Sequence, residues 1–159
     1  MRFLFPDMAS SNARWAPLLL RMIVGYGFMA HGLAKLARGP DNFTQILAAL
    51  GMPFPALLSW ATILVEIFGG AAFLMGALVC LAGIPSLVVL LVAIVTVHLP
   101  NGFSSIKLQS VDAAGAHFGQ PGYETDLLYI ACILALMLCG AGQWSVDGWI
   151  ARRLRKSTN

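Results

Sequence analysis

The chain has 159 residues, of which 58% are hydrophobic and 11% are charged, and its mean hydropathy is +0.79. Average chains carry about 25% charged residues, so this chain cannot cover a water-facing surface with ionic groups and we expect it to lie in lipid. The same figures exclude an intrinsically disordered chain, and three cysteines are too few for a disulfide scaffold. The net charge is +3, but the basic residues crowd near the C-terminus, so no nucleic-acid partner is indicated.

Four apolar segments are candidates for crossing a membrane, which takes roughly 20 apolar residues. The first is 15–36. Residues 56–99 are long enough for two crossings at ~1.5 Å per residue, and a turn between Gly76 and Gly83 predicts spans at 56–77 and 83–99. The fourth and shortest is 125–142. The predicted fold class is therefore all-α, an integral membrane four-helix bundle that forms a single transmembrane domain over residues 1–159.

Two amphipathic segments flank these spans. The first lies in the loop after span 1 and repeats its apolar residues at helical spacing: Phe43, Ile46, Leu47 and Leu50. This spacing predicts a short helix on the outer membrane surface. After span 4, apolar and basic residues occupy opposite faces of a tail from residue 146 onward, which predicts a helix along the anionic cytoplasmic leaflet.

The distribution of basic residues predicts the orientation. Arg2 and Arg14 precede the first span, and the C-terminal cluster follows the fourth: Arg152, Arg153, Arg155 and Lys156. Because positive residues favour the cytoplasmic side, both termini are expected there. The stretch Met1–Pro6 is too short for the apolar region of a secretory signal, so we expect the first span to be retained.

Ionisable residues inside a membrane are costly and therefore indicate function by default. Seven lie within or at the ends of the spans: Arg21, His31, Lys35, Glu66, His98, Glu124 and Asp126. Because spans 1 and 3 run outward and spans 2 and 4 run inward, most of these groups converge on the outer half of the bundle. Structural roles compete with this interpretation, since Lys35 can snorkel to the interface and His98, Glu124 and Asp126 can stabilise helix ends.

Glu66 and Arg21 are the most deeply placed of these charges. Their depths differ by roughly 6–8 Å at ~1.5 Å per residue, within reach of two extended side chains, which favours a structural Arg21–Glu66 clamp. In the alternative, Glu66 exchanges protons beneath a ligand pocket lined by His31 and His98. The sequence has no phosphate-binding loop, Cys-x-x-Cys or His-Glu-x-x-His motif, so electrons would have to pass through a bound small molecule or a partner.

An ordered set of motifs resembles the DoxX family of small bacterial membrane proteins. On the N-terminal side the motifs are Arg21-x-x-x-Gly25, His31-Gly32-x-x-Lys35, Leu50-Gly51-Met52-Pro53-Phe54-Pro55 and Val65-Glu66-Ile67-Phe68-Gly69-Gly70. They continue with His98-Leu99-Pro100-Asn101-Gly102-Phe103, Gly122-Tyr123-Glu124 and Gly140-x-Gly142-Gln143-Trp144. Gln143 departs from the basic residue that is common in the family at that position.

The resemblance implies four helices in the bacterial inner membrane and a link to quinone-dependent redox complexes or oxidative stress. It maps the family's polar positions onto Arg21, His31, Lys35, Glu66, His98, Asn101 and Glu124. We expect Glu66, His31 and His98 to be catalytic, Arg21, Lys35, Asn101 and Glu124 to bind ligand, and no residue to be assigned to a metal.

Three functions follow from these observations. The leading one is a membrane component of a quinone-linked redox system, in which imidazole and carboxylate groups exchange the protons and a redox partner protein supplies the electrons. The second is a haem or metal site at His31 and His98. The third is a non-catalytic anchor or assembly subunit that docks through the loop 100–123. Besides lipid and a redox partner, a second copy of the chain is an expected partner.

Overall fold

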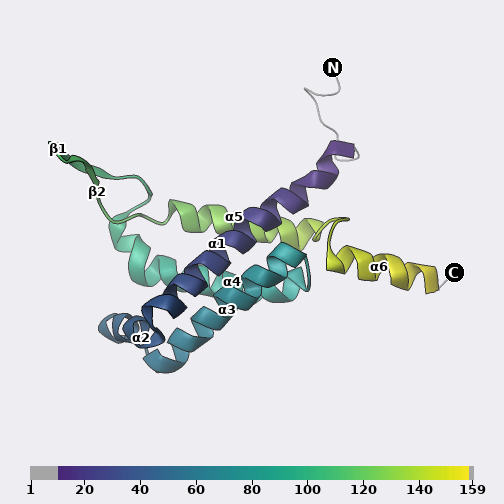
Figure 1. Ribbon diagram of the computed structural model, residues 1–159, viewed down its shortest axis with the longest axis horizontal. Helices are drawn as coiled ribbons and strands as arrows, with labels where there is room; N and C mark the ends of the chain where they lie inside the picture. The colour runs from purple at the N-terminus through teal and green to yellow at the C-terminus, as the bar shows by residue number, and fades with distance from the viewer. Residues whose placement is uncertain (1–10, 158–159) are drawn as a thin grey trace, which may run out of the picture.

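The computed structural model describes residues 11–157, which are mostly helical with one two-stranded sheet (Figure 1). A 3₁₀ segment, Ser11–Trp15, leads into α1, Ala16–Arg38. The helix ends where Gly39 adopts a φ of 96°, a conformation that glycine reaches without steric cost. Arg2 and Met1–Pro6, which bear on the predicted orientation and signal, lie outside the described residues.

The short amphipathic helix expected after the first span is present as α2, Pro40–Ala49. Pro40 occupies its first turn, where a missing N–H costs nothing, and Asp41 adds a favourable charge at the helix N-terminus. The helix packs against α3, and Ser59 Oγ of α3 donates to the Pro40 carbonyl over 2.9 Å. The start of α2 is thereby fixed over the first turns of α3.

The next two helices are α3, Pro55–Met75, and α4, Val79–Ala93. The turn between them is short, with positive φ values at Gly76 and Leu78. The third predicted span, which corresponds to α4, therefore begins at Val79 and not at the predicted residue 83. The difference arises because Pro85 lies inside α4 rather than at its start. Membrane helices tolerate proline where hydroxyls bond nearby carbonyls, and Ser86 Oγ donates to the Ala82 carbonyl over 2.9 Å.

The chain beyond α4 departs from an all-α fold. A π-helical segment, Ile94–His98, and a 3₁₀ turn, Leu99–Asn101, are followed by an antiparallel hairpin of β1, Leu108–Asp112, and β2, Gly115–Phe118. The all-α expectation was therefore wrong for this loop. An irregularity in the pairing between Leu108 and Ser110 interrupts the alternation that identifies a strand, and every residue of both strands is exposed.

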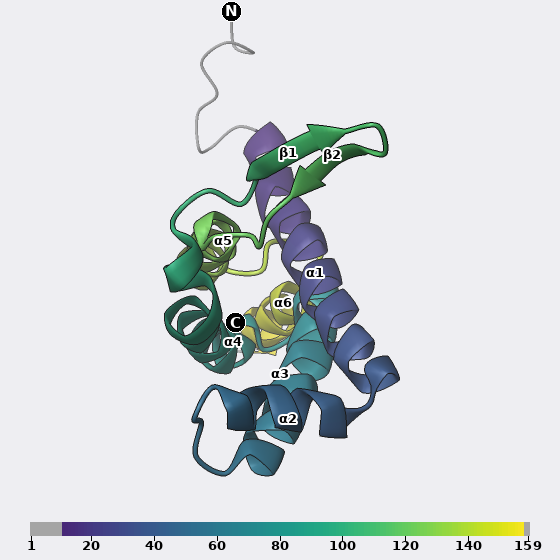
Figure 2. The same cartoon turned by 90° about the vertical axis from the view of Figure 1, so that its left-hand side faces the viewer.

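Two helices complete the chain, α5, Glu124–Cys139, and α6, Val146–Ser157. α5 stops short of the predicted residue 142 because Gly140 and Gly142 both have positive φ. α1 and α4 each pack against both α3 and α5, as the end-on view in Figure 2 shows. The hairpin and α2 lie at one end of the molecule, and α6 lies with the start of α1 at the other (Figure 1).

The interior is held by apolar side chains and by close backbone contact. The buried core comprises Val24, Phe28, Phe73, Val79, Leu90, Ile133, Leu136 and Ala141. Gly25 of α1 faces Gly70 of α3 so closely that a Cβ on either would lie 2.7 Å from the other's carbonyl oxygen. Small residues permit this approach between helices in lipid, where hydrophobic burial supplies little drive.

The outer surfaces of the helices are apolar. Among the described residues, three helical stretches are long and apolar enough to cross a membrane: Ala13–Arg38, Pro55–Met75 and Val79–Asn101. No more than 33% of each apolar window is buried, and large side chains such as Leu19, Phe68 and Leu81 are exposed. A surface of this kind suits lipid rather than water, so the chain is a membrane protein. α5 has 16 residues and does not qualify by length.

Candidate functional site

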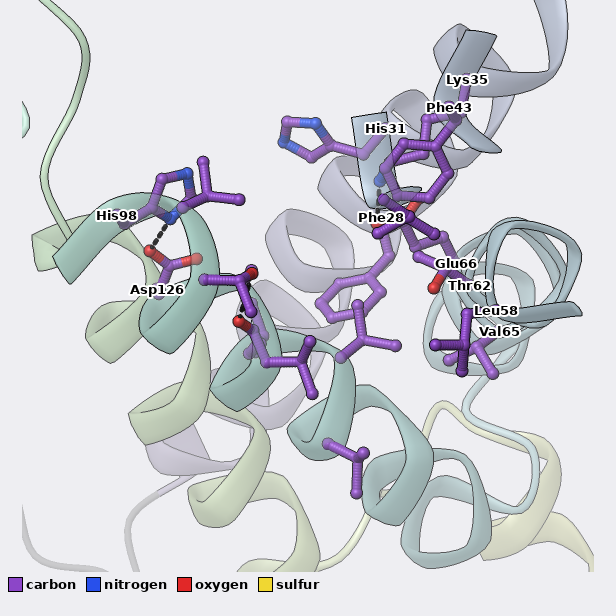
Figure 3. A pocket seen from close by; sticks show the side chains of 18 of the residues that line it. Phe28, His31, Lys35, Phe43, Leu58, Thr62, Val65, Glu66, His98 and Asp126 are labelled. Atoms are coloured by element: carbon purple, nitrogen blue, oxygen red, sulfur yellow. Dashed lines mark hydrogen bonds and ion pairs between the residues drawn. The ribbon is translucent and has the colours of Figure 1, made fainter. Parts of the chain in front are cut away.

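A cavity of about 850 Å³ lies in the half of the molecule that carries α2 and the hairpin. Its walls come from the C-terminal half of α1, from α2, from the first turns of α3, from the end of α4 and from the first turns of α5. Most of the lining is aliphatic or aromatic, as with Phe28, Leu58, Val65, Val88 and Val92. Figure 3 shows the few charged side chains of the lining on two opposite sides of this apolar space.

One charged pair joins α1 to α3. Lys35 Nζ donates to Glu66 Oε1 in a short ion pair (Figure 3), and the Lys35 ammonium also lies 5.1 Å from the centre of the Phe43 ring. Glu66 is buried, with 6% of its surface exposed. Its second oxygen, Oε2, is buried and has no hydrogen-bond partner, which leaves an acceptor unsatisfied in an apolar setting.

Gly32 explains how this pair can form. A Cβ at Gly32 would lie 2.9 Å from the Cβ of Glu66 and 2.8 Å from Cγ1 of Ile67, both closer than real Cβ contacts. The absence of a side chain therefore brings α1 against α3, within reach of the Lys35 ammonium one turn later on α1.

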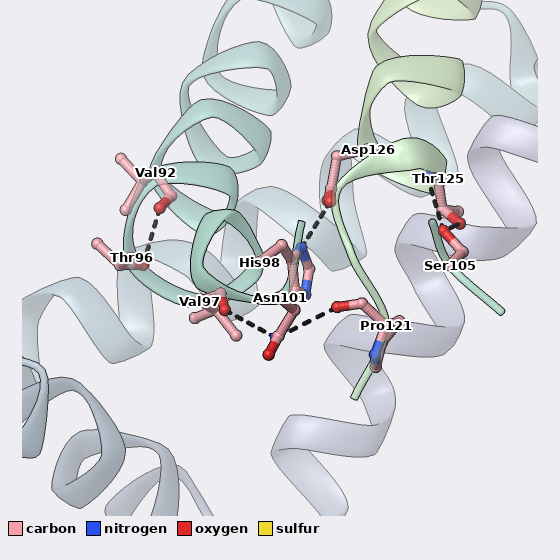
Figure 4. Close-up of polar contacts among 9 residues, drawn as sticks. All are labelled: Val92, Thr96, Val97, His98, Asn101, Ser105, Pro121, Thr125 and Asp126. Atoms are coloured by element: carbon pink, nitrogen blue, oxygen red, sulfur yellow. Dashed lines mark hydrogen bonds and ion pairs between the residues drawn. The ribbon is translucent and has the colours of Figure 1, made fainter. Parts of the chain in front are cut away.

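A second polar pair joins the π-helical segment after α4 to the start of α5. His98 Nδ1 and Asp126 Oδ2 are 2.5 Å apart, and Asp126 is buried with 7% of its surface exposed (Figure 4). When Asp126 is ionised, its carboxylate only accepts hydrogen bonds, and Nδ1 is then the donor of the pair. In the neutral ring this leaves Nε2 as an acceptor.

Loop contacts place Asp126 opposite His98. The amides of Gly122, Tyr123 and Glu124 donate to the carbonyls of residues 104, 102 and 103 over 2.9–3.1 Å. The Phe103 and Tyr123 rings pack edge to face with their centres 5.6 Å apart. The two ends of the hairpin loop are thus held together, and the first turn of α5 lies beside the last turn of the α4 segment.

The structure places the predicted residues in two groups. Four line the cavity: His31, Lys35, Glu66 and His98. Asn101 and Glu124 do not line it. Asn101 Nδ2 donates to the Val97 and Pro121 carbonyls over 3.2 and 3.3 Å (Figure 4), and Glu124 Oε2 accepts the Ser105 amide over 2.9 Å. Both residues therefore stabilise the loop at the rim.

Arg21 is also absent from the cavity, and the predicted Arg21–Glu66 clamp is wrong. Arg21 has 1% of its surface exposed, and its Nη2 donates to the Trp144 carbonyl over 2.7 Å. Glu66 pairs with Lys35 instead. Depth along a helix does not specify the direction in which a side chain points, and Lys35 is long enough to reach down from the interface.

The sequence leaves both a helix-capping role and a role in the site open for Asp126, and the structure pairs it with His98 at the cavity wall. The signal was available, since both residues were expected at the outer ends of antiparallel neighbours. Tyr129, on the same helix, also lines the cavity and was not predicted. Within residues 11–157, no group of three or more His, Cys, Asp or Glu side chains is arranged to hold a metal ion.

Comparison with known proteins supports the family relationship. The DoxX family model matches residues 16–99, more than half of the chain. The chain belongs to the DoxX family. It is 28% identical over 157 residues to "Uncharacterized membrane protein Rv3486" of Mycobacterium tuberculosis, across 94% of this chain and 90% of that protein. It is 31% identical over 86 residues to "Putative oxidoreductase CatD" of Bacillus subtilis, across 54% of this chain and 62% of that protein. No solved structure matches it.

In this DoxX-family protein the matched segment holds only part of the cavity. Lys35, Glu66 and His98 lie within residues 16–99, whereas Asp126 and the hairpin lie beyond them. The carboxylate that orients His98 thus comes from the segment outside the family match.

Proposed function

We propose that this protein is a membrane component of a quinone-linked redox or oxidative-stress system and that its cavity holds a quinone head group. The observation that carries the proposal is one apolar cavity with a pair of ionisable side chains on each of two opposite sides, Lys35–Glu66 and His98–Asp126. Small-molecule sites are typically apolar spaces of about 300–1,000 Å³ with a few placed polar groups. The cavity matches that description.

The residues present fit such a ligand. The aliphatic walls that α3 and α4 contribute suit an isoprenoid or alkyl tail. Burying an acceptor without a partner is costly, so the unpartnered Oε2 of Glu66 favours a ligand with a polar group at this wall. A quinone head group carries oxygen atoms at two opposite positions of its ring, and the cavity carries its two polar pairs on opposite sides.

The chemistry of the two pairs supports proton exchange. Reducing a quinone to a hydroquinone takes two electrons and two protons. Imidazole exchanges protons near neutral pH, and Asp126 holds the His98 ring in one orientation. The electrons must come from a partner protein or a soluble reductant. The name of the Bacillus subtilis relative, a putative oxidoreductase, agrees with a redox role.

We further propose a four-span topology in the bacterial inner membrane, with α5 as the fourth span and both termini cytoplasmic. At ~1.5 Å per residue, the 16 residues of α5 cover about 24 Å, and a short span is accommodated by local thinning of the bilayer. The basic α6 lies at the same end of the molecule as the start of α1 (Figure 1). Positive residues at that end favour a cytoplasmic location.

Mass spectrometry of small molecules that copurify with the protein in mild detergent tests the proposal. We expect a quinone or hydroquinone in the wild-type sample and a loss of at least about tenfold in Glu66→Gln, which removes the buried charge. Asp112→Asn, the same carboxylate-to-amide change on the exposed hairpin, should retain the ligand. If the wild-type protein carries neither a quinone nor a hydroquinone and binds neither added decylquinone nor added decylhydroquinone, the proposal is contradicted.

An anchor or assembly role is the second candidate, because the fully exposed hairpin presents Val111 and Phe118 away from the helices. In that case substitutions in the hairpin should abolish function, whereas Glu66→Gln and His31→Ala should preserve it. The quinone proposal predicts the opposite order. A haem or metal site would be revealed by a visible spectrum and elemental analysis of the purified protein.

A further inference from the structure

We propose that the cavity selects the reduced, hydroquinone form of its ligand over the oxidised quinone. The inference rests on the proposed function and concerns the direction of the hydrogen bonds that the cavity offers. A quinone carbonyl only accepts hydrogen bonds, whereas each hydroquinone hydroxyl donates one and also accepts. The two forms therefore require different partners at the same positions.

The His98 side of the cavity offers an acceptor. Asp126 Oδ2 lies 2.5 Å from Nδ1, and Asp126 is buried. We infer that an ionised Asp126 holds the ring hydrogen on Nδ1. Nε2 of the neutral ring then carries a lone pair, and no described residue forms a hydrogen bond with it. A ligand hydroxyl can donate to this nitrogen. A carbonyl oxygen at the same place would oppose one lone pair with another.

The Lys35–Glu66 side offers both an acceptor and a donor. Lys35 uses one of its three N–H groups on Glu66 Oε1, and Oε2 has no partner. A hydroxyl placed here accepts from the lysine, and it donates to Oε2 once the carboxylate turns to open this buried atom to the cavity. A carbonyl accepts from the lysine but leaves Oε2 unsatisfied.

The two sides together favour the hydroquinone. It can satisfy His98 Nε2 and Glu66 Oε2, whereas the quinone leaves both acceptors without a donor. Because a buried acceptor left unpaired is costly, we expect the hydroquinone to bind at least about tenfold more tightly.

Calorimetric titration of the full-length protein in detergent, under anaerobic conditions, tests this selectivity. The ligands are decylhydroquinone, decylquinone and the dimethyl ether of decylhydroquinone, which has no hydroxyl donors. We expect the hydroquinone to bind at least about tenfold more tightly than the other two. Equal or tighter binding of the quinone would overturn the selectivity and leave the proposed function standing. Binding of none of the three would overturn the proposed function itself.

Asp126 is a positioning residue in this account, and Asp126→Asn tests it. An amide can donate to Nδ1, which moves the ring hydrogen to Nε2 and turns that atom into a donor. The preference for hydroquinone should therefore fall several-fold, while Asp112→Asn in the exposed His117–Asp112 pair should leave it unchanged. An unchanged preference in a folded Asp126→Asn protein, judged by circular dichroism, would contradict the role.

A measurement on the wild-type protein covers the case in which Asp126→Asn does not fold. ¹⁵N NMR of histidine-labelled protein distinguishes a protonated from an unprotonated ring nitrogen, and the His98 signals are assigned by their loss in His98→Gln. At neutral pH we expect hydrogen on Nδ1 and none on Nε2. Hydrogen on Nε2 would overturn the inference.

Discussion

Two His–Asp pairs in the molecule have the same side chains in different surroundings. His98–Asp126 spans 2.5 Å between the π-helical segment after α4 and the start of α5, with side chains 26% and 10% exposed. His117–Asp112 spans 2.9 Å within the hairpin, with side chains 51% and 58% exposed. Water competes for the second pair but is largely excluded from Asp126 in the first. The same two residue types therefore differ in burial, and under the proposed function only the buried pair beside the cavity takes part in proton exchange.

The hairpin pair is explained by local structure alone. The hydrogen bond from His117 lowers the pKa of Asp112, and the Ala114 amide, which donates to Asp112 Oδ1 over 2.8 Å, lowers it further. Both partners belong to the same hairpin and fix its turn. This pair joins two strands of one hairpin and does not connect helices. It therefore serves as an internal control for the buried pair.

The largest expected effect comes from breaking the buried charge pair. Lys35→Met leaves the Glu66 carboxylate without its ammonium, and removing one partner of a buried ion pair costs about 3 kcal/mol or more. The double variant Lys35→Met with Glu66→Leu should recover most of that loss. Thermal or denaturant unfolding in detergent measures both. Little change in the single variant would show that this pair is no more structural than an exposed one.

Breaking the buried His–Asp pair should have the next largest effect. Asp126→Ala removes a hydrogen bond to a charged group, for which about 2 kcal/mol of unfolding free energy is typical. Asp112→Ala should give no measurable change in the same assay. Similar losses in the two variants would remove the distinction between the pairs.

A change that adds one methyl group tests the geometry without altering any charge. Gly32→Ala places a Cβ against Glu66 and Ile67, which forces α1 and α3 apart and should cost about 1–2 kcal/mol. It should also weaken ligand binding by displacing Lys35 from Glu66. Ala34→Ser, a small change on the exposed face of α1, serves as the control and should alter neither binding nor stability. Gly51→Ala is unsuitable because Gly51 has a positive φ. Binding and stability equal to wild type would contradict the role given to Gly32.

The smallest effect concerns pH and the hairpin. Because the pKa of Asp112 is lowered in the folded chain, its contact with His117 contributes above the ordinary aspartate value of about 3.9 and is lost as the pH falls through the folded value. NMR titration should show the Ala114 amide shift changing only below about pH 4. A midpoint above that value would contradict the assigned hydrogen bonds.

Composition and periodicity were enough to predict the membrane class, the positions of α1, α2, α3 and α6, and the gathering of His31, Lys35, Glu66 and His98 in one half of the molecule. The Lys35–Glu66 pair was not predictable, because the depth of Arg21 and Glu66 along their helices was known while the directions of their side chains were not. That direction depends on how closely α1 and α3 approach, and glycine contacts such as Gly32 set this distance.

The hairpin and Asp126 were missed for different physical reasons. The irregular pairing near Leu108 removes the alternating pattern of a strand, and both faces of the hairpin are exposed, so no hydrophobic periodicity marks it. Asp126 stands where acids stabilise helix N-termini, and its sequence position fits that role as well as it fits pairing with His98. Only the folded loop, which brings the ends of α4 and α5 together, separates the two roles.

Photo-crosslinking tests whether the cavity between α1, α3 and α4 binds a quinone head group. The full-length protein in detergent is irradiated with an azido-quinone, and the labelled peptides are identified by mass spectrometry. We expect labels on the cavity-lining segments of α1, α3 and α4. These labels should disappear when excess unlabelled decylhydroquinone competes for the cavity. Labels confined to the hairpin or α6, or labels that competition does not reduce, would contradict quinone binding in this cavity.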